Sequence, residues 1–258
     1  MGNRDGGTSN RVPSSIQVRS VICNCHACVY LPNRTANLPL ILPTQLLTEK
    51  ALDDALEAGM RRSGYFLYYT DCPTCQACEP ARLRAKDFRW TDSWRRIRNR
   101  GDKSLTTSIA RPSASPEKLK LFNRHRNERG LSESGRAYHE EDYSGFLVES
   151  SGAWTHELQF HEGNRLIGVS VIDCGSNSLS AVYTYFDPDC SRYSLGTYSI
   201  LKQIEICLLT NREFLYLGLY VAENAHLSYK ARFGPQQRRV GDKWVDIEVD
   251  PKPEAILG

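Results

Sequence analysis

Long apolar runs are absent from this sequence of 258 residues. No segment approaches the roughly 18 consecutive apolar residues of a membrane-spanning helix. The first twenty residues are polar and rich in Gly, Ser and Arg, without the apolar stretch of a secretory signal peptide. Internal repeats and long low-complexity tracts are missing too, and 40% hydrophobic with 24% charged residues argues against global disorder. We therefore expect a folded, cytoplasmic protein.

Charge of one sign is also scarce, since the formal net charge is only +3. One stretch differs, because residues 82–103 contain nine Lys or Arg side chains against three Asp side chains. It interleaves Trp90 and Trp94 with arginines; guanidinium groups pair with phosphate oxygens, and flat side chains stack on exposed bases. The pattern fits either a solvated surface or a nucleic-acid contact. The candidate nucleic-acid-binding residues are Arg95, Arg96, Arg98 and Arg100.

Cysteine, in contrast, is plentiful, with nine in the chain. Thiols stay reduced in the cytoplasm, which favours metal ligation or reactivity over a disulfide framework. Six of them fall in the two groups C-N-C-H-A-C and C-P-T-C-Q-A-C, namely Cys23, Cys25, Cys28, Cys72, Cys75 and Cys78. Together the groups can supply four thiolates to zinc or to an iron–sulfur cluster. A redox-active dithiol and simple burial are the alternatives, and burial is expected for the isolated Cys174, Cys190 and Cys207.

Hydrophobic periodicity predicts helices over residues 46–58, 119–147 and 197–209, with Gly59 ending the first and Thr197 capping the last. Strands are predicted over residues 64–69, 165–173, 180–186 and 214–221. The pair 165–173 and 180–186 flanks a Cys-Gly-Ser-Asn-Ser turn and is typical of a hairpin. Residues 101–117 carry two prolines and many small polar residues, as in a domain junction or long loop. The fold class is α/β (α+β).

Seven short motifs follow one another in order along the chain, before a final Trp244. They are C-x-Y-L-P at Cys28–Pro32, G-x-R-R-S-G at Gly59–Gly64, C-x-x-C-x-A-C at Cys72–Cys78, S-x-V-Y-x-Y-F-D-P at Ser180–Pro188, S-L-G-T-Y-x-I-L at Ser194–Leu201, Y-L-G at Tyr216–Gly218 and Y-K-x-x-F-x-P at Tyr229–Pro235. In this combination the chain resembles the N-degron aminoacyl-tRNA–protein transferases, which comprise the bacterial aspartate/glutamate leucyltransferases and the arginyl-tRNA–protein transferases.

The polar composition of residues 1–20 predicts a flexible tail. The resemblance implies a cysteine-rich domain, placed over residues 21–105, followed by an N-acetyltransferase-like mixed-sheet domain over 106–258. It implies transfer of leucine or arginine from charged tRNA to proteins that begin with Asp or Glu, which marks them for degradation. The motifs favour leucine. Aminoacyl-tRNA is the co-substrate and the nucleic acid that the basic stretch would contact. Two metal-ligand sets are implied: Cys25, Cys28, Cys75 and Cys78, or Cys28, Cys72, Cys75 and Cys78.

The reaction is aminolysis of an ester that is already activated, so no cofactor is required for the chemistry. An acidic acceptor needs a cation that binds its carboxylate. The candidates for binding this carboxylate or the tRNA end are Arg61, Arg62, Lys230 and Arg232, with Tyr216 and Tyr229 from the same motifs and Ser194, Leu195 and Gly196 at a helix N-terminus. The catalytic candidates are Asp187, Tyr185 and His125; capping a turn is the alternative for Asp187, and a structural role is the alternative for His125.

Two other functions remain open from the sequence. An acyl-CoA-dependent N-acetyltransferase would need a Gly/Arg-rich pyrophosphate loop, which Ser-Arg-Tyr-Ser-Leu-Gly supplies poorly. A non-catalytic zinc-containing RNA-binding protein would account for the cysteines and the arginines, but it leaves the motifs of the second half without a role.

Overall fold

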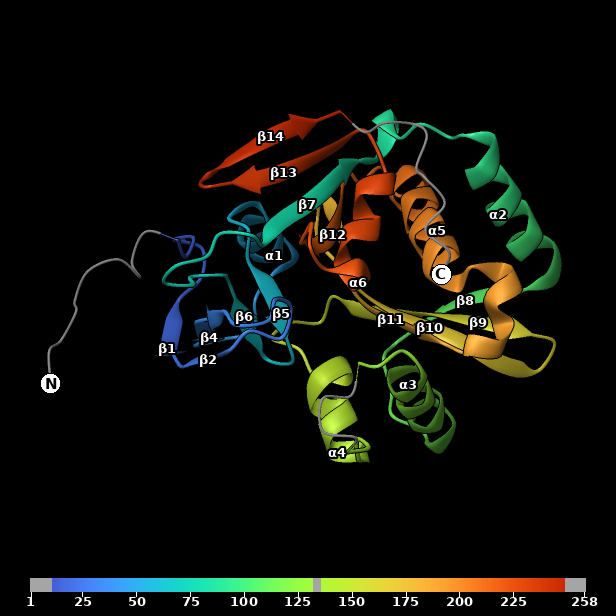
Figure 1. Ribbon diagram of the computed structural model, residues 1–258, viewed down its shortest axis with the longest axis horizontal. Coiled ribbons are helices and arrows are strands. Elements are labelled where there is room, and N and C mark those ends of the chain that lie inside the picture. Colours follow the sequence, from blue (N-terminus) through green and yellow to red (C-terminus); the bar gives the residue numbers. More distant parts are fainter. Residues whose placement is uncertain (1–10, 132–135, 249–258) are drawn as a thin grey trace, which may run out of the picture.

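The computed structural model describes residues 11–131 and 136–248, and Figure 1 shows their arrangement. An eight-stranded sheet lies beside a four-stranded sheet, and a short two-stranded ribbon accompanies the latter. Within the described ranges, no helix has both the length and the apolar character needed to span a membrane.

The four-stranded sheet has the order β1-β4-β6-β5. Its strands are β1 (Val18–Ile22), β4 (Leu40–Pro43), β6 (Phe66–Tyr68) and β5 (Arg61–Ser63), and the ribbon pairs β2 (Cys25–Ala27) with β3 (Thr35–Asn37). Helix α1 (Glu49–Glu57) begins where the Thr48 side chain accepts a hydrogen bond from the Ala51 amide, and Gly59 follows it at φ +82°. The predicted first helix and its glycine end are confirmed.

The eight-stranded sheet has the order β14-β13-β7-β12-β11-β10-β9-β8. Its strands are β7 (Glu79–Arg84), β8 (Thr106–Ala110), β9 (Thr155–Glu162), β10 (Arg165–Cys174), β11 (Ser178–Phe186), β12 (Phe214–Tyr220), β13 (Gln236–Val240) and β14 (Lys243–Ile247). The β10–β11 hairpin predicted from the sequence is confirmed. Among the described strands of this sheet only β11 and β12 pair in parallel, which makes the sheet mixed, as expected.

Helices cover both faces of this sheet (Figure 1). On one face α2 (Asp92–Ser104) and α5 (Leu195–Leu209) pack together, and on the other α3 (Pro116–Glu128) lies against β10 and β11 beside α4 (Glu140–Tyr143). Each face has its own buried cluster, which includes Leu201 on the first face and Phe122 on the second. The expected third helix starts at Leu195 rather than at Thr197, and its cap is Ser194 in the left-handed conformation at φ 49°. The predicted N-cap was therefore wrong.

The structure differs from the predicted division of the chain in three places. Strand β7 and helix α2 precede residue 105, yet they belong to the large sheet and its helical layer. The stretch 101–117, expected to be a loop, holds the end of α2, strand β8 and the start of α3. Within the expected tail, residues 1–10 lie outside the described ranges, whereas Ile16 is buried and β1 starts at Val18.

The two sheets share a core. Leu52 and Leu67 of the N-terminal part pack in one buried cluster with Trp154 and Tyr216, and Tyr216 lies on β12 of the large sheet. Burial of apolar side chains therefore fixes the small sheet against the large one.

Candidate functional site

Strands β11 and β12 separate shortly after they pair. Their parallel register covers three positions, from Ser178 opposite Phe214 to Ser180 opposite Tyr216, although β11 continues to Phe186 and β12 continues to Tyr220. Beyond that point the facing main-chain groups of the two strands need other partners.

Two cationic side chains bind main-chain oxygens in the stretch where the strands have separated. Arg61 Nη2, from β5 of the small sheet, donates to the carbonyl oxygen of Ala181 on β11 at 3.1 Å. Lys230 Nζ, from the 3₁₀ turn η5 (Tyr229–Arg232), donates to the carbonyl oxygen of Leu219 on β12 at 2.6 Å. Side chains from the N-terminal and the C-terminal parts of the sequence therefore meet between β11 and β12.

Gly218 leaves the space in which these cations sit. A Cβ atom at this position would stand 3.0 Å from Arg61 Nη2 and 3.1 Å from Lys230 Nζ. The residue has φ +94°, and the pairing of β12 with β7 shifts register between Tyr216 and Gly218. Glycine suits both requirements, because it adopts positive φ and has no side chain.

The site is electropositive and shielded from water. Arg61 is 7% exposed and Lys230 is 8% exposed, and neither forms an ion pair with a carboxylate within the described part of the chain. Burial, together with the nearby charge of Arg61, lowers the pKa of Lys230 to about 7. Burial likewise raises the pKa of Tyr30 and Tyr68, which interact with Arg61. Two buried cations without a counter-ion favour an anionic ligand.

Arg62 points away from this site. Consecutive strand residues face opposite sides of a sheet. Arg62 Nε pairs with Asp173 Oδ2 at 2.7 Å, both side chains are 1% exposed, and Thr155 donates to the other carboxylate oxygen at 2.7 Å. Arg62 is thus a structural residue, and the expectation that it binds substrate is corrected.

The other predicted substrate-binding residues are dispersed. Arg232 places its guanidinium 5.3 Å from the ring centre of Trp94. The Tyr216 hydroxyl bonds to Arg82 and to Glu57, on the side of α1. Tyr229 lies next to Lys230 in η5 and is 37% exposed. Of the four cations expected to gather, the structure brings together Arg61 and Lys230.

Within residues 11–131 and 136–248, the side chains of the three catalytic candidates bond to residues other than Arg61, Lys230 and Gly218. The Asp187 carboxylate accepts hydrogen bonds from Arg124 at 2.8 Å, from Arg165 and from the Asp189 amide at 3.0 Å, which is the turn-capping alternative. The Tyr185 hydroxyl bonds to that of Tyr143 at 2.7 Å, and burial raises its pKa.

His125 is also held in the interior. Its Nδ1 lies 3.0 Å from the carbonyl oxygen of Phe186, and burial lowers its pKa to about 4. The ring is therefore neutral at pH 7, as expected for a structural histidine. A reaction beside Gly218 therefore finds poor proton carriers in His125, in the ion-paired Asp187 and in the protonated Tyr185.

The predicted anion site at the start of α5 has a specific geometry. Ser194 is exposed, Leu195 is buried, and Gly196 faces the Phe186 ring, which a Cβ there would approach to 3.5 Å. The Ser194 side chain makes no capping hydrogen bond. The tRNA terminus remains the predicted ligand of this site.

Helix α2 presents its arginines mostly to solvent. Arg95 pairs with Asp92 at 3.3 Å, Arg98 pairs with Glu205 at 3.4 Å, and Arg100 donates to a main-chain oxygen on η4 (Pro188–Tyr193) at 2.6 Å. Arg96 is exposed. All four remain predicted tRNA contacts.

Four of the clustered cysteines lie near one another. Burial raises the pKa of the Cys78 thiol to about 12, and the neighbouring Cys72, Cys28 and Cys75 add to the shift. Cys25 lies exposed on β2. Across residues 11–131 and 136–248, no three His, Cys, Asp or Glu side chains are arranged to hold a metal ion. Thiolates are ligands that soft metals prefer. Cys78 and its neighbours Cys28, Cys72 and Cys75 form the second of the two metal-ligand sets implied by the resemblance.

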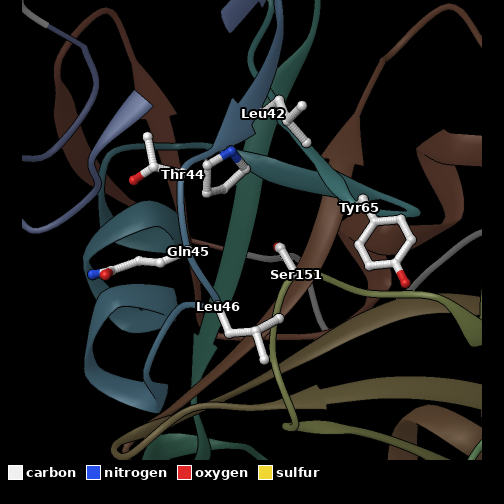
Figure 2. Close-up of a pocket in the computed structure, with 7 residues that line it drawn as sticks. Leu42, Thr44, Gln45, Leu46, Tyr65 and Ser151 are labelled. Carbon is white, nitrogen blue, oxygen red and sulfur yellow. The ribbon is translucent and has the colours of Figure 1, made fainter. Parts of the chain in front are cut away.

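A shallow pocket of about 340 Å³ lies apart from these residues. Figure 2 shows Leu42, Leu46 and Tyr65 around it, with Thr44, Gln45 and Ser151. It contains none of the predicted site residues.

Comparison with known proteins identifies the family. Residues 26–96 match the family described as "Arginine-tRNA-protein transferase, N terminus", and residues 117–240 match "Arginine-tRNA-protein transferase, C terminus". An aspartate/glutamate leucyltransferase of Aeromonas hydrophila is 36% identical over 232 residues, which cover 89% of this chain and 94% of that protein. The chain belongs to the arginine-tRNA-protein transferase family.

Two further aspartate/glutamate leucyltransferases agree with the assignment. An aspartate/glutamate leucyltransferase of Pseudomonas putida is 36% identical over 223 residues, covering 86% of this chain and 94% of its own. One from Acinetobacter baumannii is 33% identical over 231 residues, covering 90% and 85%. Among solved structures, the C-terminal domain of a putative lysylphosphatidylglycerol synthetase from Agrobacterium fabrum has a TM-score of 0.45 and 14% identity, over 66% of this chain and 51% of that chain. The resemblance found in the sequence motifs is confirmed, and neither alternative function explains a match in both halves.

The sequence analysis did not select Gly218 as a functional position in this family member. The signal was present, because a glycine inside the apolar strand run 214–221 marks a bulge or a close approach. Tyr30 and Tyr68 were also overlooked. Nothing in their spacing indicates that they lie near Arg61.

Proposed function

We propose that this aminoacyl-tRNA–protein transferase moves leucine from leucyl-tRNA to the α-amino group of proteins that begin with Asp or Glu. Relatives that cover nearly the whole chain are named aspartate/glutamate leucyltransferases, which supports leucine over arginine as the donated residue. The proposed product carries a new N-terminal leucine and is marked for degradation. The predicted cytoplasmic location remains a prediction.

The observation that carries the proposal is the pair of buried cations beside Gly218. An acceptor that begins with Asp or Glu brings a carboxylate, and the pair has no carboxylate partner in the described part of the chain. One N–H of Arg61 is engaged by Ala181, which leaves the others for a bidentate contact with the acceptor. The acceptor amine would then lie next to its own side chain, close to Lys230.

The chemistry requires positioning and charge stabilisation. The aminoacyl ester is already activated, so the enzyme has to hold the acceptor amine against the ester carbonyl. The tetrahedral intermediate bears a negative oxygen, and fixed positive charge in a site shielded from water stabilises it. Arg61 provides such charge between the separated strands.

The donor tRNA is proposed to contact two regions. The exposed arginines of α2 are suited to its phosphates, and the start of α5 is suited to its terminus. Cys28, Cys72, Cys75 and Cys78 are proposed to hold zinc or an iron–sulfur cluster as a structural element. The reaction itself does not need this metal.

The test is a transfer assay. The purified protein is incubated with leucyl-tRNA or arginyl-tRNA and with peptides that begin with Asp, Glu, Lys or Ala. Mass spectrometry is expected to show one added leucine on the Asp and Glu peptides alone. Addition of arginine instead would reassign the donor, and no gain of mass on any peptide would refute the transferase reaction.

A further inference from the structure

The proposed reaction needs a proton acceptor that the described catalytic candidates do not provide. An α-amino group has a reference pKa near 8, so most acceptor molecules carry an ammonium group at neutral pH. The ammonium has no lone pair and must lose a proton before it attacks the ester. Asp187 is ion-paired, and Tyr185 and His125 are held by Tyr143 and Phe186.

Lys230 is placed where such a proton acceptor is needed. Its Nζ lies between the separated strands, 2.6 Å from the Leu219 carbonyl oxygen and facing Gly218 together with Arg61. A neutral amine keeps that hydrogen bond with one N–H and still presents a lone pair. The absence of a side chain at Gly218 lets the Lys230 amine approach the main chain of β12 at this point, where a Cβ would stand 3.1 Å from Nζ.

The surroundings of Lys230 contain charge of one sign. The elements packed against η5 are α6 (Ala225–Ser228) and β12. Their titratable side chains are His226, Tyr216 and Tyr220, while η5 itself adds Tyr229 and Arg232 and β5 adds Arg61. No carboxylate stands on these elements, so nothing there favours the protonated form of the Lys230 amine.

We propose that Lys230 is the proton acceptor of aminoacyl transfer and that Arg61 binds the acceptor's side-chain carboxylate. This inference rests on the proposed function. The two cations thus differ in role, because a guanidinium stays charged in proteins whereas a buried ammonium readily gives up its proton. Burial lowers the pKa of Lys230 to about 7, which agrees with this role.

The step balances as follows. The neutral Lys230 amine takes one proton from the acceptor ammonium, and the freed lone pair forms a C–N bond with the ester carbonyl carbon. The C–O bond to the tRNA ribose then breaks, and the ribose oxygen takes up the second proton of the attacking nitrogen. The proton on Lys230 passes to water, which restores the amine.

The first experiment compares wild type with Lys230→Arg and Lys230→Gln, using leucyl-tRNA and a peptide that begins with Asp. Arginine keeps the positive charge but cannot accept the proton. For Lys230→Arg we expect kcat to fall by about 100-fold or more while KM changes by a few-fold at most. Wild-type kcat should fall below about pH 7, as Lys230 becomes protonated. In Lys230→Arg the rise with pH should shift to the higher pKa of the acceptor amine itself, near 8.

A second acceptor tests the role even if a variant is less well folded. A peptide whose terminal amine is replaced by an aminooxy group is far less basic, so its nitrogen is largely unprotonated at neutral pH and needs no base to expose its lone pair. The defect of Lys230→Gln should shrink at least tenfold with this acceptor relative to the ordinary peptide. Lys120→Gln, which removes an exposed charge from α3, serves as the matched control and should behave as wild type with both acceptors.

The outcomes separate the two proposals. A wild-type protein that transfers no leucine refutes the proposed function. An active wild type whose Lys230 variants keep kcat and its pH dependence refutes the proton-acceptor role and leaves the function standing. A raised KM with unchanged kcat, or equal defects with both acceptors, would make Lys230 a binding or structural residue and would also overturn the inference.

Discussion

Two adjacent arginines on one short strand have opposite environments. Arg61 lies between β11 and β12 and forms no ion pair with a carboxylate in the described ranges, whereas Arg62 is ion-paired with Asp173 on the other side of the strand. Strand geometry accounts for the difference, since neighbouring side chains project to opposite faces. The sequence shows that both are arginines in the G-x-R-R-S-G segment at Gly59–Gly64, but it does not show which face meets the large sheet.

The Arg62 pair should contribute to stability rather than to catalysis. We expect Arg62→Met to lower the free energy of unfolding by about 3–5 kcal/mol, because it leaves the buried Asp173 carboxylate without its partner. Urea unfolding followed by circular dichroism measures the change. Lys50→Met is the matched control, since Lys50 is exposed in its pair with Asp54, and it should leave the free energy of unfolding close to the wild-type value. Equal losses in the two variants would contradict the structural role of Arg62.

At the scale of elements, much of the secondary structure was predictable. Helix α1 and the β10–β11 hairpin follow from apolar periodicity and from turn residues that act locally. The start of α5 was not predictable in the same way, because Ser194 adopts a left-handed conformation that usually belongs to glycine. The separation of β11 from β12 was also hidden, since it depends on Arg61, 120 positions before Ala181. Likewise, sequence motifs selected Lys230 without revealing its burial.

Gly218 should be more important for activity than for folding. Gly218→Ala is expected to reduce transfer to Asp and Glu peptides by at least tenfold, because the new methyl group crowds Arg61 and Lys230. Steady-state kinetics measures the effect. Gly241→Ala is the matched control: Gly241 also has positive φ, at +59°, but a Cβ there meets nothing within 4 Å. It should carry a similar backbone cost of about 1–2 kcal/mol and keep full transfer activity. Similar activities for the two alanine variants would refute this role of Gly218.

Helix α2 offers a separate test of tRNA binding. Replacing Arg95, Arg96 and Arg100 by Gln should weaken leucyl-tRNA binding and lower the slope of log K against log salt by roughly two, because fewer phosphates are neutralised. Fluorescence anisotropy at several salt concentrations measures both quantities. A control that replaces the exposed Arg19, Lys120 and Lys243 removes the same charge from other surfaces. If both triple variants lose affinity equally, α2 has no specific part in tRNA binding.

At the scale of the whole molecule, the N-terminal part is joined to the large sheet by more than a linker. The buried cluster of Leu52, Leu67, Trp154 and Tyr216 spans both sheets, and the Trp244 indole donates to the Glu57 carbonyl oxygen at 2.9 Å. Composition suggested a boundary near residue 105, because it detects polar, proline-containing segments and not the pairing of β7 with β12. Non-local strand pairing is the part of the architecture that local patterns convey least.

The cysteine cluster should affect the stability of the folded protein. We expect Cys72→Ser, Cys75→Ser and Cys78→Ser each to lower bound metal, measured by inductively coupled plasma mass spectrometry, and to lower the melting temperature. Cys23→Ser should keep the wild-type metal content, because Cys23 is exposed and does not contribute to the shift at Cys78. Wild-type protein purified without any metal or iron–sulfur cluster would refute the proposed site.

The reach of Arg61 across to β11 has an evolutionary consequence. The guanidinium comes from the first family segment and the amine from the second, so neither segment alone contains both halves of the cation pair. The oxygens they hold are peptide carbonyls, which any residue supplies, so hybrids that combine segments of two relatives need not match side chains at Ala181 or Leu219. They must, however, inherit a glycine where Gly218 stands, and this one position limits which partners are interchangeable.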